Sequence, residues 1–230
     1  MKTPVWVICI LLGLASYLGC ILAQGYPLWS AGKPFLWFPQ DTGSIIELIG
    51  FVSGVVAVFL YTIPLRVGYL VGVVNVATYA YLFFAELQHY GNGLLQLVWL
   101  YYMFDGWWNW KKQSESAEFI VSRITKRQGL ISAGTFILLT PVAYAALVQA
   151  GGKLPFLDAA TTGISLAAQF LQNRRVLECW PIWMFVNILY VGMYATRGWY
   201  ATMLLSVIFF FLALRGLILW RRLEKSSAAA

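Results

Sequence analysis

Charged residues are scarce in this sequence of 230 residues. Only 11% are Asp, Glu, Lys or Arg, whereas 60% are hydrophobic and the mean hydropathy is +0.72. A soluble domain of this length carries far more charge on its surface. The composition therefore predicts an integral membrane protein whose main surroundings are the lipid bilayer.

Residues suited to metal binding or catalysis are also few. The sequence holds three cysteines, Cys9, Cys20 and Cys179, with no CxxC pair, and a single histidine, His89. It contains no HExxH, no glycine-rich phosphate loop and no Ser/His/Asp arrangement. These absences argue against a metal site, a cofactor and an enzyme. The net charge of +7 does not indicate nucleic-acid binding, because Lys and Arg gather at the ends of apolar segments.

What the sequence does contain is a series of apolar segments of roughly 20 residues, long enough to cross a hydrocarbon core of about 30 Å as helices. The expected helices are 5–23, 44–63, 67–87, 93–110, 130–149, 155–172, 178–196 and 199–220. The first is also compatible with a signal peptide, although no good cleavage site follows it. The segments predict an all-α membrane bundle.

Basic residues predict how the chain is oriented and divided. The polar connection at 111–128 is rich in Lys and Arg, which places it in the cytoplasm together with both termini. The predicted units are an N-terminal helix with an outer loop (1–43), a first three-helix repeat (44–110), this cytoplasmic loop (111–128), a linker helix (129–152), a second three-helix repeat (153–222) and a tail (223–230).

The two three-helix units look like copies of each other. Asn75 matches Asn187 at an offset of 112 residues, and Gly106 matches Gly216 at an offset of 110. Two three-helix units have the same orientation in the membrane only when an odd number of helices separates them. Segment 129–152 supplies this one helix. Parallel repeats of this kind are a transporter architecture that holds its substrate near the membrane midplane.

The segment 178–194 is the most informative stretch. As a helix it places Trp180, Trp183, Asn187 and Tyr190 on one face, at spacings of three and four. An amide in hydrocarbon is costly without a partner, so Asn187 either cross-links helices or faces a ligand. Aromatic side chains above and below it offer walls for a cationic ring. Asn75 lies at the same depth of the first repeat.

Asp105 and Arg215 occupy equivalent positions in the two repeats and therefore equal depths. We expect either a structural ion pair between them across the repeat axis or a role for Asp105 as the counter-ion of a cationic substrate or as a proton carrier.

Residues 169–187, QFLQNRRVLECWPIWMFVN, resemble the signature of the Pnu family of bacterial vitamin transporters. The shared features are a basic pair, an acidic residue, Trp-x-x-Trp and an amide, which here are Arg174, Arg175, Glu178, Trp180, Trp183 and Asn187. The first repeat is similar to the family through Glu47-x-x-Gly50, Asn75, Leu94-Leu95-Gln96 and Gly106-Trp107.

This resemblance implies a seven-helix core like that of the SWEET sugar transporters, in the bacterial inner membrane. It also implies facilitated diffusion of an unphosphorylated vitamin, which a cytoplasmic kinase then traps, and a homotrimer. Nicotinamide riboside is the favoured substrate, ahead of thiamine and then riboflavin; a non-transporting receptor or scaffold is the alternative from another class. The implied substrate-site residues, with two tyrosines from the same helix faces, are Trp180, Trp183, Asn187, Asn75, Gln169, Gln96, Tyr79 and Tyr190. Asp105 and Arg215 depart from the neutral residues of other members.

Overall fold

The computed structural model describes residues 42–86, 90–114, 119–149, 154–197 and 200–229. Most of these residues form α-helices and one π-helix, and none of them belongs to a strand. The elements are α2 (Thr42–Thr62), α3 (Val67–Tyr81), the π-helix η1 (Leu82–Glu86), α4 (Tyr90–Ser114), α5 (Lys126–Gln149), α6 (Pro155–Asn173), α7 (Cys179–Arg197) and α8 (Tyr200–Ala229). The predicted helix at 5–23 lies outside the described residues.

The observed bounds follow the apolar segments closely, with two corrections. Helix α4 continues to Ser114 and α5 begins at Lys126, so the polar connection between them is shorter than predicted. Helix α8 continues to Ala229, so most of the predicted tail from 223 onward is helical. This extension is rich in Leu, Glu, Lys and Ala, which favour helix even where the chain is polar.

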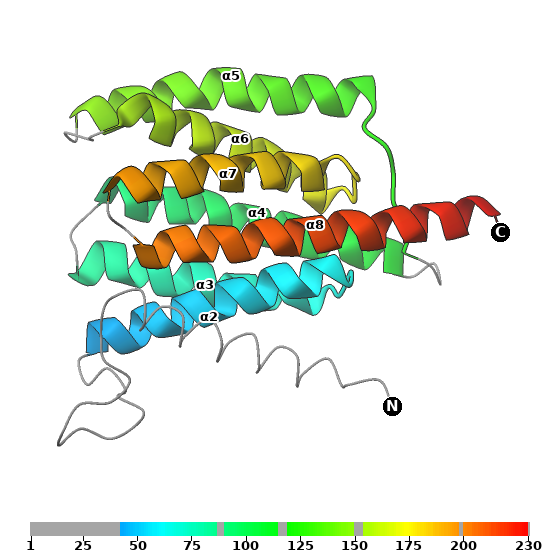
Figure 1. Cartoon of the computed structure of the whole chain (residues 1–230), viewed down its shortest axis with the longest axis horizontal. Coiled ribbons are helices and arrows are strands. Elements are labelled where there is room, and N and C mark those ends of the chain that lie inside the picture. Colours follow the sequence, from blue (N-terminus) through cyan, green and yellow to red (C-terminus); the bar gives the residue numbers. More distant parts are fainter. Residues whose placement is uncertain (1–41, 87–89, 115–118, 150–153, 198–199, 230) are drawn as a thin grey trace.

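The helices run back and forth along one long axis (Figure 1). Helix α3 packs between α2 and α4, and α7 packs between α6 and α8. The two groups meet through contacts of α2 with α8 and of α4 with α6, while α5 packs against α6 at one margin of the bundle. Helices α2, α4, α6 and α8 all finish at the same end, which we call the Asn173 end.

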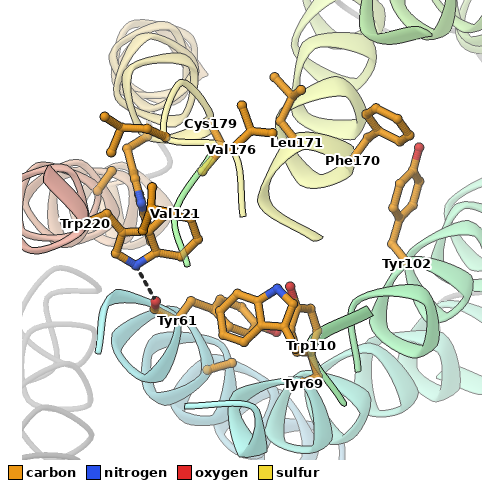
Figure 2. Close-up of a cluster of buried hydrophobic side chains, with 14 of the residues drawn as sticks. Tyr61, Tyr69, Tyr102, Trp110, Val121, Phe170, Leu171, Val176, Cys179 and Trp220 are labelled. Carbon is orange, nitrogen blue, oxygen red and sulfur yellow. Dashed lines mark hydrogen bonds between the residues drawn. The ribbon is translucent and has the colours of Figure 1, made fainter. Parts of the chain in front are cut away.

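An aromatic cluster fills the core at the Asn173 end. It consists of Tyr61, Tyr69, Trp110, Phe119, Trp180 and Trp220, and Figure 2 shows four of these rings converging from α2, α3, α4 and α8. Neighbouring ring centroids in the cluster lie 4.8 to 6.2 Å apart, mostly in edge-to-face or tilted arrangements. Such contacts add to the free energy gained by burying apolar area. The cluster therefore ties the ends of five helices together.

Candidate functional site

The predicted face of α7 divides into a packed part and a more open part. Trp180 is 1% exposed, and its ring meets Trp220 edge-on with centroids 5.2 Å apart. A Cβ added to Gly216 would lie 2.6 Å from the Trp180 ring, so only glycine allows α8 to come this close. Trp180 is thus a core residue of the aromatic cluster, whereas Trp183, one turn on, is half-buried.

The two predicted amides both bind helix carbonyls. Asn187 is buried, and its Nδ2 donates to the Trp183 carbonyl in its own helix at 2.8 Å. Asn75 is half-buried on α3, and its Nδ2 donates to the Gly50 carbonyl of α2 at 2.6 Å. In both residues the NH₂ group is engaged within the bundle. Asn75 also links two helices, which is the structural role open to a membrane amide.

The remaining predicted site residues, two tyrosines and one glutamine, lie farther from the Asn173 end. Tyr190 stacks on Tyr194 with centroids 5.5 Å apart and planes inclined by 17°, and its hydroxyl lies 3.4 Å from Ser165 Oγ. Tyr79 packs over Gly50, where an added Cβ would lie 3.0 Å from its ring. Gln96 is half-buried on α4.

Asn173, which the sequence analysis did not select, is the centre of a hydrogen-bond network. Its side chain is fully buried, and its Oδ1 accepts from the Tyr69 hydroxyl at 3.0 Å and from Gln169 Nε2 at 2.8 Å. Its Nδ2 donates to the Tyr102 carbonyl at 2.8 Å and to Asp105 Oδ2 at 2.9 Å. One amide therefore joins α3, α4 and α6. The predicted site residue Gln169 belongs to this network.

The predicted pairing of Asp105 with Arg215 is wrong. Asp105 Oδ2 pairs with Arg174 Nη1 at 3.0 Å, and its Oδ1 accepts from Asn109 at 2.9 Å. Arg215 donates instead to the Thr62 hydroxyl. Equal depth in a bundle does not bring two side chains together, because each helix also has its own rotation, which points Asp105 at α6 and Arg215 at α2.

Residues 119–125, between α4 and α5, form a strap across the turn that joins α6 to α7. The Ser122 amide donates to the Arg175 carbonyl at 3.0 Å, and the Leu177 amide donates back to Ser122 at 2.9 Å. Arg175 has a φ of 58°, a costly conformation for a residue with a side chain. Its buried guanidinium lies 4.3 Å over Phe119 and donates to the Trp110 carbonyl at 2.9 Å. Burial lowers the pKa of Arg175 to about 10.

Arg123 anchors the strap at the surface. It binds both carboxylate oxygens of Glu224 in α8 and lies 3.4 Å from Glu178 at the start of α7. The hydrogen bond with Glu224 is the largest contribution raising the pKa of Arg123. Arg123 is largely exposed, so these pairs position the strap more than they stabilise it.

Two cavities border the described residues. One of about 240 Å³ is polar and is lined by Asn109, Ser122, Gln128, Asn173 and Arg174; the other, about 400 Å³, is apolar and is lined by Ile49, Val52, Ser53, Val56 and Val71. Neither is lined by Asn75 or Asn187. In the part of the chain that the structure describes, no three His, Cys, Asp or Glu side chains gather as a metal site would require.

The outer surface of the bundle is apolar. Leu130, Leu138 and Phe156 are each at least 70% exposed, and residues 126–149 and 203–227 pass length and hydropathy criteria for spanning a membrane. Water would oppose so large an apolar surface, whereas lipid accepts it. Helices of membrane length with a buried polar network at one end define an all-helical membrane protein.

Comparison with known proteins gives the particular family. The chain belongs to the nicotinamide mononucleotide transporter family, whose model matches residues 44–222. It is therefore a membrane transporter, and this match covers every described helix except the first residues of α2 and the end of α8.

Curated relatives and a solved structure agree with this assignment. The nicotinamide riboside transporter PnuC of Escherichia coli (strain K12) is 26% identical over 221 residues, covering 84% of this chain and 89% of the relative. The protein of that name from Neisseria mucosa is 29% identical over 202 residues, covering 82% and 76%. The crystal structure of the vitamin B3 transporter PnuC shares the fold, with a TM-score of 0.68 at 24% identity over 96% of this chain and 92% of that one.

Proposed function

We propose that this protein carries nicotinamide riboside across the membrane by facilitated diffusion. The observation that supports this most is the 26–29% identity with curated nicotinamide riboside transporters, which extends over more than four fifths of the chain. Trp183 and Asn187 of α7 offer an aromatic wall beside an amide. Each close stack or cation–π contact with a pyridinium ring contributes about 0.5–2 kcal/mol.

The unphosphorylated riboside fits the described residues better than the mononucleotide that gives the family its name. A phosphate needs a cluster of cationic side chains, and the described helices carry no cluster of Lys and Arg near their middle. Arg174 binds Asp105, Arg175 binds the Trp110 carbonyl, and Arg215 binds Thr62. A cytoplasmic kinase that phosphorylates the product would then make net uptake unidirectional.

We further propose that α2–α4 and α6–α8 are two parallel repeats joined by α5. Trp110 Nε1 donates to the Gln172 carbonyl at 3.3 Å, and its repeat equivalent, Trp220 Nε1, donates to the Tyr61 carbonyl at 3.2 Å. Figure 2 shows the second of these bonds. The two acceptors lie within one residue of equivalence at the offset of 112, because 61 plus 112 is 173.

The charged contacts follow the same symmetry. Asp105 of α4 binds Arg174 of α6, and the equivalent positions are Arg215 of α8 and Thr62 of α2, which also bind each other. The contacts of α2 with α8 and of α4 with α6 exchange in the same way. This correspondence supports a 3+1+3 arrangement, to which residues 1–41 would add a further helix.

The substrate site we propose lies between the repeats, with Trp183, Asn187 and Asn75 closest to the ligand. Gln96, Tyr79 and Tyr190 would line its approach, whereas Trp180 and Gln169 would support it from the packed Asn173 end. In the inner membrane of a bacterium, the basic connection at 111–128 and both termini would face the cytoplasm. A homotrimer is the assembly we expect.

Uptake into proteoliposomes tests the function directly. Purified full-length protein should carry labelled nicotinamide riboside down its concentration gradient, with protein-free liposomes as the control. Competition by unlabelled thiamine and riboflavin tests the other vitamins. Uptake no faster than in protein-free liposomes would contradict transport and favour a scaffold, whereas preferential uptake of thiamine would contradict only the choice of vitamin.

A further inference from the structure

Gln172, in the last turn of α6, carries a buried hydrogen-bond donor that has no acceptor among the residues the structure describes. The side chain is 3% exposed, and its Oε1 accepts from Trp183 Nε1 at 2.8 Å. An indole nitrogen only donates, so the atom facing Trp183 is the carbonyl oxygen and the NH₂ group points away from it. Among the described residues, nothing accepts a hydrogen bond from Gln172 Nε2.

A buried NH₂ group without an acceptor is unfavourable. The NH₂ group of neighbouring Gln169, by contrast, has an acceptor. Gln169 Nε2 lies one turn away on α6 and donates to Asn173 at 2.8 Å. The backbone of Gln172 is equally well fixed, since its carbonyl accepts from Trp110 at 3.3 Å and from the Arg175 amide at 3.0 Å. The unused donor is therefore held in place by the bonds around it. A ligand that supplies an acceptor would satisfy it.

The position of this donor beside Trp183 indicates which part of a ligand it meets. A flat ring stacked on the half-buried indole would bring its edge close to the amide that binds the indole edge. The edge of the nicotinamide ring carries a carboxamide, whose oxygen accepts hydrogen bonds.

We propose that Gln172 is a specificity-determining residue that holds Trp183 through Oε1 and donates through Nε2 to the carboxamide oxygen of the pyridinium ring. This inference rests on the proposed transport of nicotinamide riboside. It assigns Gln172 the role that Gln169, engaged with Asn173, does not fill. It would also disfavour thiamine, which has no carbonyl group on its rings.

The test is a double-mutant-type cycle in which the side chain at position 172 and the carboxamide group of the ligand are each removed, alone and together. Binding to purified full-length protein is measured by calorimetry for nicotinamide riboside and for the pyridinium riboside that lacks the carboxamide. Wild-type protein should bind the first about tenfold more tightly, as expected for a hydrogen bond made in a buried site. In Gln172→Met that preference should fall to about twofold or less. The matched control, Gln149→Met at the exposed end of α5, should retain the full preference.

A second variant distinguishes two roles of Gln172: recognition of the ligand carboxamide and support of the Trp183 indole. Gln172→Glu keeps an oxygen for the indole N–H and has no donor once its carboxyl group is ionised, so at a pH above its titration it too should lose the preference for the carboxamide. If Gln172→Met weakens both ligands by the same factor and Gln172→Glu restores both, Gln172 only supports the indole and the proposal is overturned. If wild-type protein binds neither riboside, the proposed function itself fails and this inference fails with it.

Discussion

The network around Asn173 gives the sharpest prediction for stability. Asn173→Leu keeps the size of the side chain but removes four hydrogen bonds. Asp105 retains Arg174 and Asn109 as partners, whereas the Tyr69 hydroxyl and Gln169 Nε2 lose the acceptor they share. Each buried donor left unpaired costs about 1–3 kcal/mol, so the loss is roughly 2–6 kcal/mol. At about 2–4 °C per kcal/mol for a chain of this size, the unfolding midpoint should fall by roughly 10 °C.

The decisive measurement is a double-mutant cycle that combines Asn173→Leu with Tyr69→Phe. The unfolding midpoint of each purified variant is measured by thermal unfolding. In the wild-type background the hydroxyl is satisfied, so its removal should lower the midpoint by a few degrees. In the Asn173→Leu background the hydroxyl is unpaired, so its removal should raise the midpoint. Tyr61→Phe is the matched control, because among the described residues the Tyr61 hydroxyl reaches only Met103 Sδ, at 3.4 Å. This substitution should have the same small effect in both backgrounds. Destabilisation by Tyr69→Phe in both backgrounds would refute the reasoning.

Three further predictions follow from the site and its supports. Trp183→Ala and Asn187→Ala should each weaken nicotinamide riboside binding about threefold to thirtyfold, measured by quenching of tryptophan fluorescence; unchanged affinity in both would place the ligand elsewhere. Gly216→Ala forces a Cβ to within 2.6 Å of the Trp180 ring and should lower the unfolding midpoint by several degrees, whereas Gly192→Ala, with nothing within 4 Å, should not. Asp105→Asn weakens a structural ion pair, so proteoliposome uptake should remain indifferent to a pH gradient, as in wild-type protein; a gradient response that the substitution abolishes would instead make Asp105 a proton carrier.

Local patterns were enough to predict the helices and to place the Trp-x-x-Trp-x-x-x-Asn residues on one of them. Apolar length alone gave α2, α6, α7 and the continuous stretch of α3 and η1 to within a few residues, because a membrane span must be helical and has a minimum length. The spacing of Trp180, Trp183 and Asn187 correctly placed them on one helix. Spacing could not show that Trp180 is buried in the aromatic cluster while Trp183 is half-buried. The burial of each side chain depends on which neighbouring helix covers that turn of α7.

The partners of the polar residues were beyond the reach of the sequence. Asp105 was matched with Arg215 by depth, yet it binds Arg174, because rotation about the helix axis decides which neighbour a side chain meets. Asn173 and Gln172 carried no signal of their own beyond lying near a charged helix end. Their importance arises only when α3, α4 and α7 pack around that turn.

The sequence by itself therefore determined that this chain is a helical membrane protein with a transporter-like pattern, because hydrophobic length, periodicity and motif are local properties. The tertiary structure alone decided which side-chain amides have hydrogen-bond partners among the described residues and that Gln172 Nε2 has none. Hydrogen bonds are short and directional, so a shift of an ångström or a turn of a helix changes the partner. Gln169 and Gln172 differ in the sequence only by their positions, and the packing gives one a structural partner and leaves the other a donor for a ligand.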